Sequence, residues 1–375
     1  EHNKAIEINS RPDRLDPPKR LLRQAVGGGC FPGGVLLVGY QGQVVYEAAV
    51  GQAALLPSRR PMTIDTVFDL ASLTKPMATA TALMRLVETG GVRLDAPISA
   101  YLSAFNACGT ASPTLRQLLS HCSGLPAWRP YYRDIDPSWP QAERRHAVYA
   151  AIHREPLNTP PGTVVQYSDA GFILLGELVE VLSGTAFDDF CHREVFAALQ
   201  LTDLRFLNPS RPQPSGVSYA STEHCPWRRR ILTGEVHDEN AWVMGGVAGH
   251  AGLFGTGRQV WQFAQRLLDG LKGQAWLVST ATLRTFTTRQ GLPEGSTWAL
   301  GWDTPTPGRS SAGRYLAPTA IGHLGFTGTS LWIDPAQQVI VVLLTNRVHP
   351  SRQREGIRAF RPLVHDAVMQ ALGLG

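Results

Sequence analysis

Apolar residues follow two spacings along this chain, and these predict strands near its ends and helices between them. Residues 33–40 and 44–50 form two apolar runs separated by a glycine-containing turn, which is typical of a β-hairpin. Residues 322–328, 330–333 and 339–345 indicate three further strands near the C-terminus. Apolar positions at helical spacing predict helices over residues 16–26, 77–89, 142–153, 170–182, 187–199, 258–268 and 354–372.

This order predicts an α/β (α+β) fold in which the two ends of the chain build one antiparallel sheet. The first and last helices would flank the sheet, and a mostly helical lobe would be inserted between the strands. We therefore expect a discontinuous sheet lobe over residues 1–70 and 298–375, and a helical lobe over residues 71–297. The two lobes would form one catalytic unit with a cleft between them, where ligands are usually held.

Composition narrows the class of protein. The chain has 375 residues, of which 43% are hydrophobic, enough to bury one large or two ordinary cores. Its net charge is +5, but the only tight basic run is at residues 228–230, which is more typical of a solvated face than of a nucleic-acid site. The longest apolar runs, such as residues 339–344, are too short to span a bilayer.

The five cysteines are odd in number and widely spaced, which favours free thiols over disulfides or a zinc cage. The first residues contain no signal segment, so a cytoplasmic location and a periplasmic or secreted one with a removed leader both stay open. The oligomeric state is left undetermined.

The first candidate catalytic residues are Ser72 and Lys75. Residues three apart share one face of a helix, so the hydroxyl and the amine can meet. Pro76 is tolerated only in a first turn, which indicates that the helix begins near Ser72. A serine needs a neighbouring base to become a nucleophile, and burial is expected to lower the pKa of Lys75 for that task.

Two further segments complete a candidate site. Tyr167 precedes a predicted helix that Ser168 or Asp169 can cap, so it is either a surface tyrosine beside a cap or a phenol shared with Ser72 and Lys75. In the second case, the ammonium would lower the pKa of the phenol. The run His323-Leu324-Gly325-Phe326-Thr327-Gly328 lies on a predicted strand, where its glycines would let a substrate approach the backbone.

Three short segments in this order resemble motifs of a known superfamily: Ser72-Leu73-Thr74-Lys75, Tyr167-Ser168-Asp169 and His323-Leu324-Gly325. They are similar to those of the class C β-lactamase, penicillin-binding protein and esterase superfamily of serine hydrolases. Residues 118–126 resemble a further marker of that family, and the likeness extends from about residue 35 to residue 372. The family fold has a five-stranded antiparallel sheet with flanking helices and a helical lobe.

The resemblance implies a role for each matching residue. Ser72 would be acylated, Lys75 and Tyr167 would move the protons, and the backbone N–H groups of Ser72 and Phe326 would bind the oxyanion. His323, Gly325 and Asp169 would face the substrate. Neither a metal nor a cofactor is implied, and the partner would be a small-molecule, peptide or glycopeptide substrate.

Two departures from the β-lactamase motifs bear on the substrate. The second motif there ends in asparagine and the third begins with lysine, whereas Asp169 and His323 stand at these positions here. A histidine with a pKa near 6.5 offers less positive charge to a carboxylate, and Asp169 would repel one. These changes favour an esterase, amidase or peptidase over efficient antibiotic hydrolysis. If neutral His323 orients the substrate, activity should rise between about pH 6 and 7.

A glycine-rich block near residues 236–254 is open to two interpretations. It contains His237-Asp238-Glu239-Asn240, which is either a buried polar network or a substrate-contacting segment, and its spacing does not indicate a metal site. This block resembles a branch of the superfamily that includes N-acetylmuramoyl-L-alanine amidases. The function we expect is a serine hydrolase that cleaves an ester or amide, with cell-wall muropeptides as candidate substrates. The alternatives are a true β-lactamase or D,D-peptidase, and a non-catalytic peptide- or sugar-binding sensor.

Overall fold

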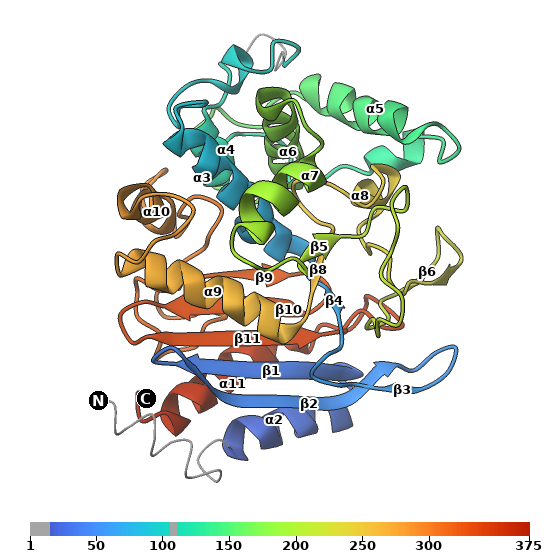
Figure 1. The fold of residues 1–375 in the computed structure, drawn as a ribbon, viewed down its shortest axis with the longest axis vertical. Coiled ribbons are helices and arrows are strands. Elements are labelled where there is room, and N and C mark those ends of the chain that lie inside the picture. The colour runs from blue at the N-terminus through green and yellow to red at the C-terminus, as the bar shows by residue number, and fades with distance from the viewer. Residues whose placement is uncertain (1–15, 106–110) are drawn as a thin grey trace.

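The computed structural model describes residues 16–105 and 111–375, and its central feature is one antiparallel sheet built by both ends of the chain (Figure 1). The strand order is β3-β2-β1-β11-β10-β9. The strands are β1 (Gly33–Tyr40), β2 (Gln43–Ala54), β3 (Arg60–Pro61), β9 (Ile321–Gly325), β10 (Thr329–Asp334) and β11 (Val339–Thr345). The five predicted strands are confirmed, and β3 adds a two-residue edge beside β2.

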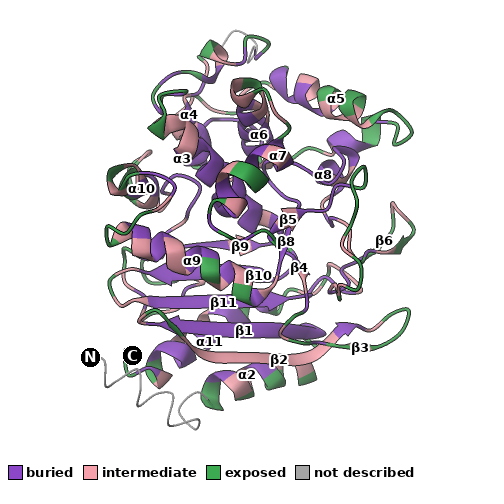
Figure 2. Cartoon of the chain, in the orientation of Figure 1, coloured by how far each residue is buried: buried purple, intermediate pink, exposed green. Residues whose placement is uncertain are grey.

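Both faces of the central strands are buried (Figure 2). Along β1, Val35 and Leu37 pack in the core that faces the helical part, whereas Leu36 and Val38 pack in a second core on the opposite face. This explains why β1 and β11 are nearly continuous apolar runs, since a strand covered on both faces has no solvent-facing positions to fill with polar residues.

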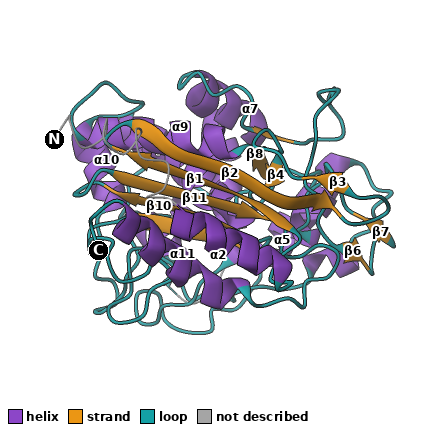
Figure 3. Ribbon diagram, turned by 90° about the horizontal axis from the view of Figure 1, so that it is seen from below, coloured by secondary structure: helices purple, strands orange, loops and turns teal. Residues whose placement is uncertain are grey.

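Helices cover the two faces of the sheet (Figure 3). The terminal helices α2 (Asp16–Gly27) and α11 (Ile357–Ala371) pack together under one face. Helix α9 (Gly257–Leu271) lies on the other face, against β1 and β11. The remaining helices of the helical part are α3 (Thr81–Glu88), α4 (Leu115–Leu119), α5 (Gln141–His153), α6 (Asp169–Ser183), α7 (Phe187–Cys191), α8 (Glu239–Val243) and α10 (Thr280–Thr287).

The core that contains Val35 of the sheet also contains Phe172 and Leu174 of α6, so the sheet and the helical part share one apolar interior. The division into two lobes at residues 70 and 298 stays a prediction. The structure also contains two small sheets that the sequence did not reveal. One is formed by β4 (Phe68–Asp69), β8 (Leu253–Gly255) and β5 (Arg205–Phe206), and the other by β6 (His224–Cys225) and β7 (Arg230–Ile231).

The helix that carries Ser72 departs from regular α geometry. A 3₁₀ turn over Ala71–Leu73 leads into a π-helical turn over Lys75–Ala80, and only then does α3 begin. The predicted start near Ser72 is therefore correct, but the predicted regular helix is not. A second π-helical turn, over His192–Ala197, follows α7 where the sequence predicted one continuous helix. Such turns often occur at functional sites.

The structure also bears on two expectations from the sequence, one about the cysteines and one about membrane-spanning helices. Cys30, Cys122, Cys191 and Cys225 are free thiols, and Cys108 lies outside the described residues. Within residues 16–105 and 111–375, no single helix is long and apolar enough to cross a membrane, although α6 and the bent helix after it pass that test as a pair.

Candidate active site

The hydroxyl of Ser72 and the amine of Lys75 meet as the sequence predicted. Lys75 Nζ donates a hydrogen bond to Ser72 Oγ at 3.0 Å and another to the backbone oxygen of His250 at 3.2 Å. The same nitrogen lies 2.7 Å from Asp169 Oδ1, and the Lys75 side chain is fully buried. A buried ammonium is stable only when it is paired and hydrogen-bonded, and these three partners satisfy that requirement.

The backbone immediately before Ser72 is strained. Ala71 has φ 48°, a conformation that costs a residue with a side chain on the order of 1–3 kcal/mol. The Asp69 carboxylate accepts hydrogen bonds from the N–H groups of Ala71 at 2.8 Å and His237 at 2.7 Å. These bonds hold the bend that directs Ser72 into the cleft, and burial raises the pKa of the Asp69 carboxyl.

Strand β9 lies against this bend. The hydroxyls of Thr327 and Thr329 donate to the carbonyls of Asp69 at 2.8 Å and Leu70 at 3.0 Å. A Cβ atom at Gly325 would lie 1.9 Å from Thr329 Oγ1 and 2.9 Å from the Leu70 oxygen, so only glycine fits there. This close approach brings residue 326 beside Ser72.

Phe326 and Ser72 line the same two cavities. Their assignment as the two backbone donors of an oxyanion hole stays a prediction. Phe326 follows the end of β9 at Gly325, in the turn before β10, rather than lying in the longer strand that the sequence predicted.

Tyr167 is positioned by a histidine whose role the sequence did not reveal. The His121 ring lies 4.5 Å from the Tyr167 ring between centroids, and its Nδ1 accepts the N–H of Ser168 at 3.0 Å. Trp298 contacts both rings, and Lys75 Nζ lies 4.6 Å from the centre of the phenol ring. Burial lowers the pKa of His121 well below its usual value, which keeps this support neutral. The only signal for His121 in the sequence was its place within residues 118–126, which resemble a marker of the family.

The expected pKa shifts of Lys75 and Tyr167 are wrong in sign. Burial does lower the pKa of Lys75, but the charge of Asp169, the interaction with Tyr167 and hydrogen bonds to both raise it more, so the net pKa is raised. Burial raises the pKa of Tyr167, and the Lys75 ammonium offsets this only in part. The resting site therefore holds an ammonium, a carboxylate and a neutral phenol.

His323 is buried beside Tyr167, with 5.9 Å between ring centroids. Its Nδ1 lies 2.7 Å from the Leu324 oxygen, and its Nε2 has no hydrogen-bond partner among the described residues. Burial and the Lys75 charge lower its pKa to about 3. The ring is neutral at pH 7 as expected, but the predicted limb between pH 6 and 7 is wrong because protonation occurs much lower.

Positive charge near His323 comes from two arginines that the sequence analysis missed. Arg361 is 6% exposed and donates to the carbonyls of Gly325 and Thr329, and Arg347 is 8% exposed and donates to the carbonyl of Phe326. Neither guanidinium has a carboxylate partner within residues 16–105 and 111–375. Burial and mutual repulsion lower the pKa of Arg361 to about 10. Both side chains therefore carry charge that an anion would stabilise.

Two cavities of about 320 Å³ flank Ser72, and both also border Tyr167 and Phe326. The first, here named the carboxylate cavity, is lined by Asp169, Asp238, Glu239 and Trp128, among others. The second, the arginine cavity, is lined by Arg347, Arg358, Arg361, His323 and Trp298, among others.

His237, Asp238 and Glu239, in the block at residues 237–240, line the carboxylate cavity. Asp238 Oδ1 accepts the N–H of Ala241 at 2.7 Å, which caps α8, and lies 2.7 Å from His250 Nε2. Asn240 bonds the backbone of Tyr132 and Arg129. The block is thus both a polar network and a cavity wall, so the two interpretations of its sequence are compatible.

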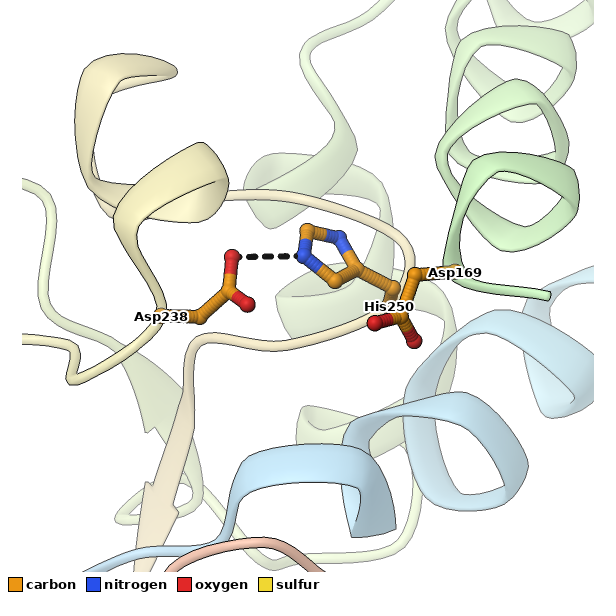
Figure 4. Close-up of side chains that lie close together, drawn as sticks. All are labelled: Asp169, Asp238 and His250. Atoms are coloured by element: carbon orange, nitrogen blue, oxygen red, sulfur yellow. Dashed lines mark hydrogen bonds and ion pairs between the residues drawn. The ribbon is translucent and has the colours of Figure 1, made fainter. Parts of the chain in front are cut away.

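Asp169, Asp238 and His250 have potential metal-ligand atoms within 4.8 Å of one another (Figure 4). Each carboxylate is already engaged, since Asp169 pairs with Lys75 and Asp238 with His250. A cation at this point would face the Lys75 ammonium, so the donor set fits a hydrogen-bond network better than a metal.

The chain belongs to the β-lactamase family: the family profile described as Beta-lactamase matches residues 19–365. It is a serine hydrolase of that family.

Two relatives place the chain near enzymes named for cell-wall substrates. It is 34% identical over 374 residues to an Escherichia coli O157:H7 protein named "Putative D-alanyl-D-alanine carboxypeptidase", covering 90% of this chain and 83% of that one. It is 33% identical over 365 residues to the N-acetylmuramyl-L-alanine amidase of Bacillus subtilis strain 168, covering 90% and 81%.

Among solved structures, the fold is similar to that of EstCE1, a hydrolase with promiscuous acyltransferase activity. The TM-score is 0.74 at 23% identity, covering 95% of this chain and 98% of that one. The octameric penicillin-binding protein homologue from Pyrococcus abyssi gives a TM-score of 0.72 at 19% identity, covering 95% and 77%. These structures agree with the predicted fold class.

Proposed function

We propose that this serine hydrolase cleaves an amide bond of cell-wall muropeptides through an acyl-enzyme on Ser72. The observation that carries the proposal is the contact of Ser72 Oγ with Lys75 Nζ at 3.0 Å, beside Tyr167 and between two cavities. The names of the two relatives support the choice of muropeptides, since one is a peptidase and the other an amidase of cell-wall components.

The resting protonation state determines how acylation must start. Lys75 is an ammonium and cannot accept the Ser72 proton until it loses one of its own. Asp169 Oδ1, 2.7 Å away, is the nearest carboxylate able to take that proton. The neutral amine would then accept the Ser72 proton as Oγ attacks the amide carbon. The Ser72 and Phe326 N–H groups would stabilise the oxyanion.

The proton taken from Ser72 would be delivered to the leaving amine through Tyr167; this role is supported by the interactions of Lys75 and Ser72 with the phenol, which lower its pKa against burial. The amine departs and leaves an ester on Ser72. Water then attacks this ester, giving its proton to the same pair and releasing the acid. Since the groups are coupled, the proton belongs to the pair rather than to one residue.

The arginine cavity favours a substrate with free carboxylates. Arg347 and Arg361 are buried cations without acidic partners, and a bound carboxylate would supply the missing charge. In the β-lactamase motif a lysine stands at the position of His323, so the sequence suggested that this site lacks a cation for an anionic substrate. The two arginines border the same cavity as His323 and can supply that charge, so anionic substrates are not excluded. Muropeptide stems carry several carboxylates, which fits this cavity.

The test is turnover of a purified muramoyl pentapeptide, followed by mass spectrometry of the products, together with labelling by a fluorophosphonate probe. We expect product release and labelling in the wild type, and neither in Ser72→Ala, with circular dichroism confirming that the variant folds. Labelling that persists in the variant would refute the assignment of the nucleophile. Tight binding of the muropeptide without any turnover would instead support the sensor alternative.

A further inference from the structure

We propose that His237 is a positioning residue, which holds the oxyanion donor Phe326 against the bend that carries Ser72. Its imidazole ring would act on one side and its backbone N–H on the other. This inference rests on the proposed function, in which the N–H groups of Ser72 and Phe326 bind the oxyanion. His237 itself lies outside the three motifs.

Phe326 lies at a point that the sheet alone does not fix. It follows the last residue of β9, Gly325, in the turn before β10, and its side chain is 49% exposed. The N–H groups of an oxyanion hole must lie within about 3 Å of the position that the oxyanion takes. A turn residue therefore needs further contacts to hold its N–H group there.

The imidazole ring of His237 supplies one such contact. It stacks on the Phe326 ring, with 5.7 Å between the centroids and 27° between the planes. The Arg347 guanidinium also lies over this ring, 4.6 Å from its centre, and Arg347 Nε donates to the Phe326 carbonyl at 2.8 Å. The exposed phenyl ring is thus held by two neighbours, and one of them also binds the backbone.

An ion-pair network fixes the orientation of the His237 ring. His237 Nε2 lies 3.0 Å from Glu223 Oε2, and the same carboxylate binds the Arg352 guanidinium at 2.6–2.9 Å. Burial raises the pKa of Glu223, but hydrogen bonds from His237 and Arg352 lower it more, to about 2. Because an ionised carboxylate only accepts hydrogen bonds, His237 Nε2 must carry a proton and donate it. This bond stops the ring from rotating away from Phe326.

The backbone of His237 reaches the nucleophile. Its N–H donates to Asp69 Oδ2 at 2.7 Å, and Asp69 Oδ1 accepts the N–H of Ala71, the strained residue before Ser72, at 2.8 Å. Asp69 and His237 are both buried, so water does not compete for these bonds. The positions of the two oxyanion donors are therefore linked through one histidine.

Two substitutions separate the ring from its hydrogen bond. His237→Phe keeps an aromatic ring beside Phe326 and loses the bond to Glu223, whereas His237→Gln keeps a hydrogen-bond donor and loses the ring. Each variant keeps the backbone N–H that binds Asp69. Arg352 stays paired with Glu223, so neither substitution leaves a buried charge without a partner.

The first measurement is turnover of a nitrophenyl ester, normalised to the active sites that a fluorophosphonate probe titrates. We expect His237→Gln to lower kcat by about tenfold with little change in KM, because displacing an oxyanion donor loses part of the roughly hundredfold effect of removing one. His237→Phe should lose no more than about threefold, since the stacked ring remains. A wild-type kcat in His237→Gln, or equal losses in the two variants, would overturn the proposal.

Phosphorus NMR of the phosphonylated enzyme probes the oxyanion hole itself. The phosphoryl oxygen of the adduct on Ser72 takes the place of the oxyanion, so its resonance depends on the two N–H donors. In His237→Gln, we expect the resonance to move from the wild-type position toward that of the adduct unfolded in urea. A resonance that stays at the wild-type position would show that His237 does not position the donors.

The matched control is His153→Gln. His153 is also buried, lies 2.7 Å from Glu177 Oε2 and packs edge-on against the Phe105 ring, but it lines neither cavity. This substitution should leave kcat and the phosphorus resonance unchanged, and effects as large as those of His237→Gln would overturn the proposal. A wild-type enzyme that is not phosphonylated on Ser72 would instead overturn the proposed function, so the two failures are distinguishable.

Discussion

Lys75 Nζ lies 2.7 Å from Asp169 Oδ1, so the amine beside the candidate nucleophile is held by a carboxylate. In the β-lactamase motif that this segment resembles, the matching residue is an uncharged asparagine. The carboxylate raises the pKa of Lys75 against the opposing effect of burial. The charge of Asp169, in the second motif, is the largest of the effects that raise the pKa of Lys75.

Replacing this carboxylate should move the pH dependence of the reaction. In Asp169→Asn the largest of the effects that raise the pKa of Lys75 is lost while burial still lowers it, so the pKa of Lys75 should fall. Because the neutral amine is the reactive form in the proposed mechanism, the ascending limb of kcat/KM, where Lys75 loses its proton, should move to lower pH. The measurement is a pH–rate profile with a neutral ester.

The control for this prediction is Asp136→Asn, an exposed carboxylate that does not line either cavity. Its profile should superimpose on that of the wild type. A limb in Asp169→Asn that stays where the wild type has it would show that Asp169 does not set the proton affinity of Lys75.

Titration of His323 should not change the pH dependence of activity near pH 7. Its pKa is lowered to about 3 by burial and by Lys75, so the ring stays neutral from pH 5 to pH 8. His323→Gln keeps a neutral polar side chain, so the shape of its profile over that range should match the wild type even if the rate falls. An inflection between pH 6 and 7 in the wild type that disappears in the variant would contradict this prediction.

Buried histidines should make the fold sensitive to acid. His365 is buried, bonds the Ser311 oxygen through Nδ1 at 2.9 Å, and has a pKa lowered to about 4 by burial. Between about pH 6.5 and 4, the unfolded chain binds this proton and the folded chain does not. The free energy of unfolding should therefore fall with decreasing pH, by about 1.4 kcal/mol per unit for this histidine alone.

Urea denaturation at pH 7 and pH 5 measures this effect. On passing from pH 7 to pH 5, the wild type should lose about 2 kcal/mol more than His365→Gln, because glutamine does not titrate. Comparing pH-dependent losses removes any stability difference that the substitution itself causes at pH 7. Equal losses in the two proteins would contradict the prediction.

Arg361 should matter most for substrates that carry a carboxylate. Arg361→Gln removes a buried cation of the arginine cavity, and hydrogen bonds to charged groups contribute about 1.5–3 kcal/mol. We expect kcat/KM for a free-acid peptide to fall by roughly tenfold more than that for its methyl ester. Arg314→Gln, an exposed residue paired with Asp366 outside this cavity, is the control and should affect both substrates equally. A loss that is the same for both substrates would indicate only a structural role for Arg361.

Local signals in the sequence were enough to predict the strands and the contact of Ser72 with Lys75. The unbroken apolar runs at residues 33–40 and 339–345 predicted strands with the observed bounds, because burial of both faces removes polar positions. The contact of Ser72 with Lys75 was also predictable, since three-residue spacing and Pro76 fix a helical start within a few residues of chain.

Features that depend on distant segments were not predictable in this way. The sign of the Lys75 shift depends on Asp169, whose approach is set by the packing of α6 against the Ser72 helix. The His121 support under Tyr167 and the uncompensated charge of Arg361 likewise arise from side chains brought together by the fold.

By itself, the sequence determined the order of elements, the antiparallel sheet and the pairing of Ser72 with Lys75, because each follows from short-range spacing and chain direction. Only the tertiary structure decided the protonation state of the site and which charged side chains line each of its two cavities. The physical reason is that electrostatic energies depend on distance and burial in space, and neither is encoded in separation along the chain.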